Sequence, residues 1–332
     1  MSNEPNIVFS FTDFNTDNAK KACKHVTQCN IADTVLLGAT QGIGNVILVT
    51  PLIKALTDMN LTVDLLNYGF NTGASEVLED MANVRLVTQE EAKDTSYLLG
   101  LQSVWPHVDV EKYVPQVRFC GNIQSVWKSG LPAHEVELNM SLAYSLRYDK
   151  EIPPLYCKYN VVPKREPEDR KYVGIHVCSR YHHQFFANRA LFEPIEIARE
   201  LEKQGFKPVI FGLEGVEGNH EAWPATTMFM TGMKLADTAG AIKQMDCMIN
   251  EDSGIMHVTA AMDVRQVAIF GPTSPVKNRP WNKKAVVINK EIECQPCQYG
   301  PKVSTCYKNE CMTISPHYIV DWVKKLLERF PE

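Results

Sequence analysis

Short apolar runs alternate with amphipathic stretches along most of the chain, a pattern typical of parallel α/β proteins. In the first half, the run Thr34–Leu37 predicts a buried strand, and Asn45–Met59 predicts a helix. Pro51 lies inside that helix, so we expect a kink there or a later helix start. Two further strands are expected at Thr62–Leu66 and at Val84–Val87. The order of strand, helix and strand predicts a doubly wound sheet.

The same alternation returns in the second half of the chain. Residues 152–170 hold four prolines among mixed charges, which is the composition of a linker. Beyond the linker, strands are expected at Tyr172–Val177, Lys207–Phe211, Cys247–Ile249 and Gln266–Phe270, and helices at Leu191–Gln204, Leu235–Gln244 and Pro316–Phe330. We therefore predict two domains: residues 1–160, with an N-terminal extension over 1–32, and residues 161–332, with a cysteine-rich segment over 294–311.

Composition narrows the class of protein. Hydrophobic residues make up 45% of the 332 positions and charged residues 22%, an ordinary globular mixture. The formal net charge of −5 argues against broad nucleic-acid binding, which needs a basic surface. The sequence has no run of about 18 apolar residues to predict a membrane helix, and its first residues lack the pattern of a signal peptide. Ten cysteines without such a signal indicate reduced thiols, so we expect a cytoplasmic protein.

The stretch Asn250–Ala261 carries the clearest candidate chemistry. Asp252, Ser253 and Gly254 follow one expected strand and precede a helix, so the turn there aims backbone N–H groups outward. A helix N-terminus binds anions, and open α/β sheets bind ligands at the carboxyl ends of their strands. These residues therefore predict an anion site in the second domain.

A glycine-rich turn follows the first strand. Gly38, Gly42 and Gly44 resemble the cofactor turn of short-chain dehydrogenases. Those enzymes also need a Tyr-x3-Lys pair, and no tyrosine here has a lysine four positions later. The acidic residue that such a turn needs further along the chain is missing unless Asp64 serves. An NAD(P)-dependent dehydrogenase therefore stays a minor alternative.

Two signatures give a resemblance that covers far more of the chain. Residues 44–56, GNVILVTPLIKAL, resemble the first signature of glycosyltransferase family 9, the ADP-heptose:lipopolysaccharide heptosyltransferases. Asp252–His257, continuing to Phe270–Thr273, resembles the second signature. Pro280–Trp281 and Cys311–Met312 fit as well, so the resemblance runs through most of the chain to its C-terminus. It implies a GT-B fold, in which two Rossmann-like domains face an interdomain cleft and the C-terminal domain holds a nucleotide-sugar donor.

The resemblance and the needs of a sugar diphosphate give a set of donor-binding candidates. They are Ser179, Arg180, His183, Glu214, Asp252, Ser253, Gly254, Met256, His257 and Thr273, with the hydroxyl of Thr259 beside them. Family members place a lysine at or near the position of His183. Histidine binds phosphate well only when protonated, so Arg180 or Arg189 is expected to carry the charge. The alternative interpretation makes Ser253 a helix N-cap and His257 a helix-face residue.

The acceptor side departs from the family at Asn45. In the heptosyltransferases an aspartate follows Gly44 and deprotonates the acceptor hydroxyl, which an amide cannot do usefully at neutral pH. Gly44 and Asn45 remain acceptor-side candidates, with Asn45 orienting the acceptor by hydrogen bonding. Asp64, His107 and His134 lie in the same half as alternative bases. The predicted catalytic set is Asn45, His257 and Arg180.

Four cysteines form a separate constellation near the C-terminus. The spacing Cys294-x2-Cys297-x8-Cys306-x4-Cys311 places four thiols within 18 residues, which is enough to close a tetrahedral site. Closed four-thiolate sites are structural, and zinc and iron both suit sulfur ligands. Some relatives that modify autotransporter proteins are known for an iron site built from such cysteines. We therefore expect structural zinc or iron, with four unmetallated thiols as the alternative.

Together these observations predict an inverting glycosyltransferase. It would move heptose or another hexose-like sugar from a nucleotide diphosphate sugar, such as ADP-heptose, to a hydroxyl of lipopolysaccharide, another glycan or a protein. No Asp-x-Asp motif is present, so no catalytic divalent ion is required. Because lipid-linked acceptors are among the candidates, peripheral contact with the inner membrane stays open. A non-catalytic sugar-nucleotide-binding or assembly protein is the alternative that Asn45 supports.

Overall fold

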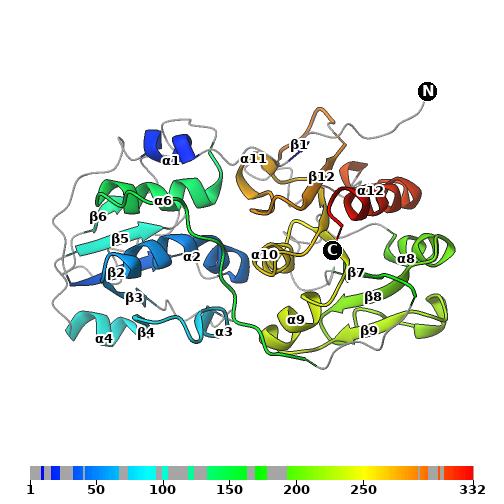
Figure 1. The fold of residues 1–332 in the computed structure, drawn as a ribbon, viewed down its shortest axis with the longest axis horizontal. Coiled ribbons are helices and arrows are strands. Elements are labelled where there is room, and N and C mark those ends of the chain that lie inside the picture. Colours follow the sequence, from blue (N-terminus) through cyan, green and yellow to red (C-terminus); the bar gives the residue numbers. More distant parts are fainter. Residues whose placement is uncertain are drawn as a thin grey trace. The chain divides into compact units, whose positions relative to one another are not determined.

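The structure consists of two compact units. This computed structural model describes residues 9–10, 16–22, 33–39, 42–66, 74–94, 99–103, 119–122, 133–162, 169–177, 193–290, 292–297, 306 and 310–331. The N-terminal unit spans Phe14–Lys158, and the C-terminal unit spans Tyr159–Glu332 together with the first residues of the chain, up to Asp13 (Figure 1). The sequence placed the whole N-terminal extension with the first domain. Instead, its strand β1 (Phe9–Ser10) pairs with the sheet of the C-terminal unit.

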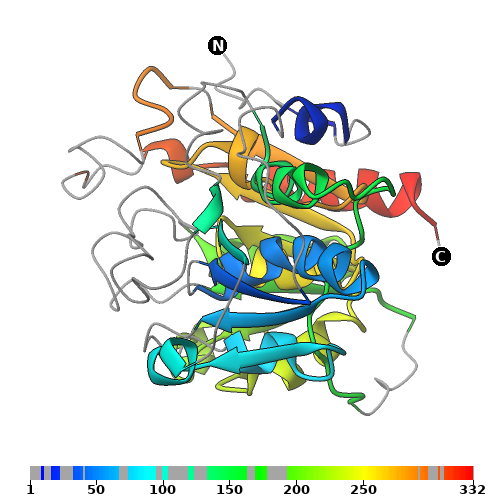
Figure 2. The ribbon, with the colours of Figure 1, turned by 90° about the vertical axis from the view of Figure 1, so that its left-hand side faces the viewer.

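The N-terminal unit is built on a parallel sheet. The strand order is β4-β3-β2-β5-β6, and each of these pairings is parallel. The strands are β2 (Thr34–Ala39), β3 (Thr62–Leu66), β4 (Val84–Val87), β5 (Leu99–Ser103) and β6 (Phe119–Asn122). The helices are α1 (Thr16–Ala22), α2 (Ile43–Asp58), α3 (Ala74–Leu78), α4 (Gln89–Asp94) and α6 (Glu135–Ser145). Helices α2 and α6 lie side by side (Figures 1 and 2).

Helix α2 begins at the glycine-rich turn and continues through Pro51. This proline has no N–H to donate to the carbonyl of Ile47, four residues earlier. The hydroxyl of Thr50 donates to that carbonyl instead, over 2.7 Å, and accepts from the backbone N–H of Tyr156 at 2.9 Å. The helix therefore runs over the whole of Ile43–Asp58. A later start is not needed because a neighbouring hydroxyl replaces the missing donor.

The C-terminal unit is built on a sheet with the strand order β1-β12-β11-β10-β7-β8-β9. All its pairings are parallel except that of β1 with β12. Its further strands are β7 (Tyr172–Val177), β8 (Lys207–Gly212), β9 (Met228–Thr231), β10 (Cys247–Glu251), β11 (Gln266–Phe270) and β12 (Ala285–Asn289). Its helices are α8 (Pro194–Lys203), α9 (Leu235–Ile242), α10 (Gly254–Ala261), α11 (Pro275–Asn278) and α12 (Pro316–Arg329), with 3-10 turns η3 (His220–Ala222) and η5 (Glu310–Met312). None of the helices in the described ranges is both long and apolar enough to cross a membrane.

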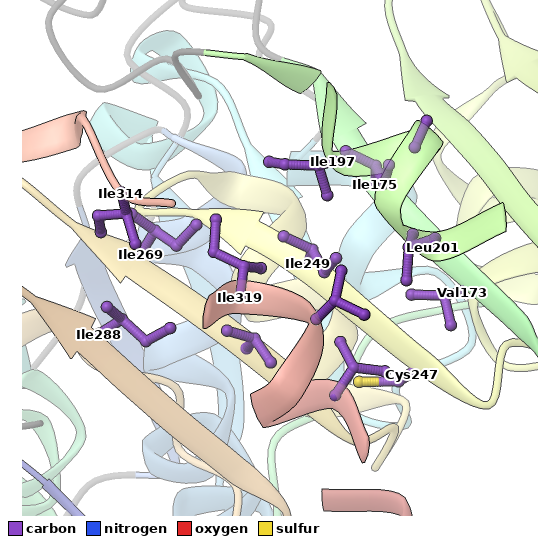
Figure 3. Packing of buried hydrophobic residues seen from close by; sticks show 14 of the residues in the cluster. Val173, Ile175, Ile197, Leu201, Cys247, Ile249, Ile269, Ile288, Ile314 and Ile319 are labelled. Atoms are coloured by element: carbon purple, nitrogen blue, oxygen red, sulfur yellow. The ribbon is translucent and has the colours of Figure 1, made fainter. Parts of the chain in front are cut away.

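One face of the C-terminal sheet is covered by α8 and α12. Alternate residues of neighbouring strands pack on that face, as the strand period of two requires. The buried cluster includes Val173 and Ile175 of β7, Cys247 and Ile249 of β10, Ile269, Ile288, and the helix residues Ile197, Leu201 and Ile319 (Figure 3). Helix α10 contacts β10, β11 and α9. This core holds the carboxyl ends of β7 and β10 next to each other.

The linker is bound to a different unit on either side of Tyr159. Lys158 donates its backbone N–H to the carbonyl of Val77 in the N-terminal unit at 3.1 Å. Asn160 donates its backbone N–H to the carbonyl of Ala236 in the C-terminal unit at 2.9 Å. The change from one unit to the other therefore falls within residues 158–160, inside the proline-containing stretch predicted as a linker.

Candidate functional site

The centre of the C-terminal sheet forms a topological switch point. Strands β7 and β10 pair in parallel, while β8 lies on the far side of β7 and β11 on the far side of β10. Open α/β sheets bind ligands beside the carboxyl ends of the strands at such a point. The predicted turn Asp252–Gly254 leaves β10 at this edge, and α10 begins at Gly254.

Ser253 occupies the N-cap position of α10 but does not cap the helix with its side chain. An N-cap serine usually accepts a hydrogen bond from a backbone N–H two or three residues later. Here the hydroxyl lies 3.3 Å from Nδ1 of His176. Ser253 therefore holds the N-cap position, as the alternative interpretation placed it, but its side chain makes no capping hydrogen bond. The Ser253 side chain accepts no hydrogen bond from the N–H groups in the first turn of α10. An anion site at a helix N-terminus needs this arrangement.

Buried amides hold α10 against the sheet. The Nδ2 of Asn250 donates to Oε1 of Gln266 at 3.0 Å, and the Nε2 of Gln266 donates to the carbonyl of Met256 at 3.3 Å. Thr259 is fully buried and donates its hydroxyl to the carbonyl of Ile255 at 2.9 Å. The expectation that Thr259 contacts a phosphate is therefore wrong, because its hydroxyl serves the packing of the helix.

Two residues to which sequence reasoning gave no role meet at the same edge. His176 lies near the end of β7, and Glu251 is the last residue of β10. The Nδ1 of His176 is 2.5 Å from Oε1 of Glu251. The carboxylate is 0% exposed and the histidine 8%. The available signal in the sequence was a titratable residue at the carboxyl end of each of two apolar strands. Their contact could be predicted only by knowing that the two strands are neighbours in the sheet.

The other predicted donor residues that surround this turn are mostly buried. Asp252 and His257 are each 5% exposed, Thr273 is 1% exposed, and Met256 is fully buried. Thr273 follows β11, the strand beside β10, and its hydroxyl has no hydrogen-bond partner among the described residues. A buried hydroxyl without a protein partner, at the carboxyl end of the strand beside β10, is a candidate to donate to a ligand oxygen.

Glu214 lies in the loop after β8 and is exposed. Gly232 supports this loop closely, since a Cβ there would lie 3.0 Å from the Cβ of Glu214. Its φ of +69° also favours glycine. Three predicted donor residues, Ser179, Arg180 and His183, lie outside the described residues together with Arg189, and their phosphate contacts stay predictions.

The acceptor-side candidates lie in the N-terminal unit. Gly44 and Asn45 are half-buried in the first turn of α2. Asp64 is fully buried and pairs with Arg85 across β3 and β4. The Nε of Arg85 donates to Oδ1 at 2.8 Å and its Nη2 donates to Oδ2 at 2.6 Å. Asp64 is therefore a structural ion-pair residue, which removes it as a replacement base and as the acidic residue of a dinucleotide site.

His134 also has a structural role. It is fully buried at the N-cap of α6, and its Nδ1 accepts from the backbone N–H of Val136 at 3.1 Å. The side chain of Glu137 accepts in return from the backbone N–H of His134 at 2.6 Å, completing a capping box. The prediction of His134 as a base is therefore wrong, and His107 lies outside the described residues.

The cysteine-rich segment packs on the loop that follows β11. The backbone N–H of Cys297 donates to the carbonyl of Pro272 at 2.9 Å. A Cβ added to Gly271 would lie 3.0 Å from Sγ of Cys311. Burial, reinforced by the other three cysteines, raises the pKa of Cys311 to about 12. Burial also raises the pKa of Cys297, with Cys294 and Cys306 adding to the effect. Within the described part of the chain, however, no three His, Cys, Asp or Glu side chains are placed to hold a metal ion, so metal binding stays a prediction.

Comparison with protein families gives a match over more than half of the chain. The model of glycosyltransferase family 9 (heptosyltransferase) matches residues 130–308. Lipooligosaccharide heptosyltransferase 2 of Campylobacter jejuni is 35% identical over 85 residues, which are 25% of this chain and 26% of that protein. Lipopolysaccharide heptosyltransferase 2 of Escherichia coli is 27% identical over 143 residues, 40% of each chain. The matched stretches thus span less than half the length of these curated relatives.

Solved structures share the fold over most of the chain. A glycosyltransferase of family 9 from Veillonella parvula has a TM-score of 0.68 at 16% identity, covering 91% of this chain and 100% of that one. The ADP-heptose lipopolysaccharide heptosyltransferase II of E. coli has a TM-score of 0.60 at 17% identity, covering 89% of this chain and 99% of that one. An E. coli heptosyltransferase with bound ADP has a TM-score of 0.62 at 15% identity, covering 88% and 99%. The predicted α/β fold of the GT-B type, with two Rossmann-like domains, is confirmed.

Proposed function

Because the chain belongs to glycosyltransferase family 9, we propose that it transfers a sugar from a nucleotide diphosphate sugar to a hydroxyl acceptor. The observation that carries the proposal is the start of α10 at the switch point of the C-terminal sheet. There Ser253 leaves the N-terminus of the helix without a side-chain cap. A helix N-terminus offers N–H groups and partial positive charge to a diphosphate. We propose ADP-heptose as the donor, because one structural relative is named for this compound.

The transfer we propose is a single displacement with inversion. An acceptor oxygen attacks the anomeric carbon of the sugar, and the bond from that carbon to the diphosphate oxygen breaks. The negative charge that develops on the leaving diphosphate is stabilised by the N-terminus of α10 and by the hydroxyls of Ser253 and Thr273. His257, one turn into α10, and Arg180 are the further catalytic residues proposed. No step requires a catalytic divalent ion.

In this scheme the proton of the acceptor hydroxyl passes to solvent water as the new bond forms. Asn45 stands where the family has its base, and it can orient the acceptor but cannot take up the proton at neutral pH. Asp64 is occupied by Arg85, and His134 by the capping of α6. These observations favour a second candidate function, in which the chain binds a sugar nucleotide without turning it over.

A panel of nucleotide sugars separates the two functions. The full-length protein is incubated with ADP-, UDP-, GDP- and CMP-sugars, and both binding and nucleotide release are measured with and without acceptor extracts. Release that depends on one donor supports transfer, whereas tight binding without release supports the second function. A protein that binds none of these nucleotides refutes both.

Serine variants test whether α10 holds the donor. Replacing Ser253→Ala removes one hydrogen bond to the diphosphate and is expected to weaken donor binding about tenfold. Ser315→Ala is the matched control, because Ser315 also occupies an N-cap position without a side-chain cap, on α12 of the same unit. Equal binding by Ser253→Ala and wild type would refute the placement of the diphosphate.

We also propose that Cys294, Cys297, Cys306 and Cys311 bind structural zinc or iron. Support comes from the donor set of four thiols and from the position of Cys297 and Cys311, which both lie beside the Gly271–Pro272 loop. Binding would need the thiols to draw closer than they are now. The metal would tie the segment together beside Gly271 and take no part in transfer. Metal analysis well below one equivalent per chain, in protein purified without chelator, would contradict this site.

The place of action and the acceptor are proposals too. We propose a cytoplasmic protein that receives its sugar nucleotide in the cytoplasm and glycosylates lipopolysaccharide, another glycan or a protein. A lipid-linked acceptor would bring it to the inner membrane as a peripheral protein. Cell fractionation with and without acceptor synthesis tests this, since a membrane-bound fraction that persists without acceptor would contradict it.

A further inference from the structure

The carboxylate of Glu251 is an unusual group to find in the interior. It is 0% exposed at the end of β10. Neither of its oxygens has a hydrogen-bond partner of good geometry among the described residues, and its close polar neighbour is Nδ1 of His176, 2.5 Å from Oε1. A buried carboxylate that lacks strong partners is costly, so its presence beside a candidate ligand site needs a reason.

The same nitrogen of His176 faces two oxygens. Besides the carboxylate at 2.5 Å, the hydroxyl oxygen of Ser253 lies 3.3 Å from Nδ1. The Nδ1–Oε1 contact lacks hydrogen-bond geometry, but a carboxylate charge at 2.5 Å attracts the proton of Nδ1 more strongly than a neutral hydroxyl oxygen at 3.3 Å. The Glu251 carboxylate therefore favours the tautomer with the proton on Nδ1.

This choice of nitrogen decides what Ser253 can do. A protonated Nδ1 cannot accept the serine proton, so the O–H of Ser253 must donate elsewhere. If Nδ1 were unprotonated, it would accept that proton and hold the hydroxyl against the sheet. Ser253 is the N-cap residue of α10, so its hydroxyl lies beside the N–H groups of the first turn. An O–H directed away from His176 therefore adds a donor to the same anion site.

We propose that Glu251 and His176 are positioning residues that keep the Ser253 hydroxyl available to donate to the diphosphate of the sugar donor. The inference deepens the proposed function and rests on it. Glu251 contacts no substrate in this scheme and acts through His176. It also explains why a carboxylate is buried at this position, which neither packing nor the second signature explains.

A double-mutant cycle tests this dependence, with ADP as the probe and calorimetry of the full-length protein as the assay. Glu251→Ala frees Nδ1 to accept from Ser253 and is expected to raise the Kd of ADP about tenfold, as Ser253→Ala does. The double variant should bind ADP no more weakly than either single variant, because both changes remove the same donated proton. Additive losses, or unchanged binding by Glu251→Ala, would overturn the inference.

A conservative variant separates positioning from folding. Glu251→Gln keeps the size of the side chain but removes the charge that favours the proton on Nδ1, so it is expected to raise the Kd of ADP about tenfold with a melting temperature close to that of wild type. Binding of ADP by Glu251→Gln as tight as by wild type would also overturn the inference. Ser315→Ala serves again as the control for serine removal. Wild-type protein that binds no nucleotide would refute the proposed function itself, whereas normal wild-type binding with a failed cycle refutes only the positioning role.

Discussion

Replacing Asn45→Asp is the most informative single change, because it supplies the carboxylate that the resemblance to the heptosyltransferases implies as the base after Gly44. Asn45 is half-buried in the first turn of α2, which has no acidic residue and no side-chain cap. A carboxylate in that turn interacts favourably with the helix N-terminus by about 0.3–1 kcal/mol. Asparagine and aspartate have nearly the same volume, so the substitution is expected to be neutral or stabilising.

The effect on turnover is expected to be much larger than the effect on stability. A well-placed general base contributes about 10²–10⁴-fold to rate, so Asn45→Asp should raise kcat by at least about a hundredfold if the proton step limits wild type. The donor KM should not change, since Asn45 lies in the other unit from the donor turn. Activity should rise with pH through the titration of the new carboxyl, near about 4 for an ordinary aspartate.

Nucleotide release in the presence of acceptor measures this directly. Asn45→Ala is the control, since it removes the amide without adding a base and should lower kcat or leave it unchanged. Thermal melting shows whether the new carboxylate is accommodated. A stable Asn45→Asp protein with normal donor binding and wild-type kcat would refute the reasoning, because the base would then have to lie elsewhere.

Three further predictions concern the framework. Arg85→Met leaves the buried Asp64 carboxylate without its bidentate partner and should lower the free energy of unfolding by about 3 kcal/mol in urea titrations; an unchanged midpoint would contradict the ion pair. Because burial and neighbouring thiols raise the pKa of Cys311 to about 12, its thiolate is scarce at neutral pH, and mass spectrometry should find its alkylation rising about tenfold per pH unit in metal-free protein. Gly240→Ala places a Cβ 1.9 Å from the carbonyl oxygen of Asn160, so the linker must shift, at a cost of about 1–3 kcal/mol; a wild-type melting temperature would contradict that contact.

Several short strands rich in apolar and β-branched residues were predictable from the sequence. Tyr172–Val177, Thr62–Leu66 and Val84–Val87 have the bounds expected. β9 (Met228–Thr231) and β12 (Ala285–Asn289) were not among the predicted strands, and each pairs in parallel with a neighbouring strand of the sheet. Periodicity describes a segment by itself, whereas pairing depends on the rest of the sheet.

The candidate site was predictable where one segment carries it. The Asp252–Gly254 turn follows directly from a strand and a helix in succession. Thr259 was misjudged because its side chain turns toward the sheet, which requires knowing the face of α10 that packs. Asp64 was misjudged because its partner, Arg85, is distant in sequence and lies directly opposite only once β3 and β4 are in register. The contact of His176 with Glu251 depends on register in the same way.

The linker has a consequence for how two bound substrates would meet. Lys158 is bound to one unit and Asn160 to the other, so Tyr159 alone separates the two anchors. Its side chain is itself held, since Lys243 donates to its hydroxyl at 2.8 Å and lies 4.0 Å above its ring. A short tether converts an encounter between molecules into one within a molecule, at an effective concentration on the order of millimolar for short linkers. For ligands carried by different units, the two chain connections, at Tyr159 and between Asp13 and Phe14, rather than the amount of protein in the cell, would set how often they meet.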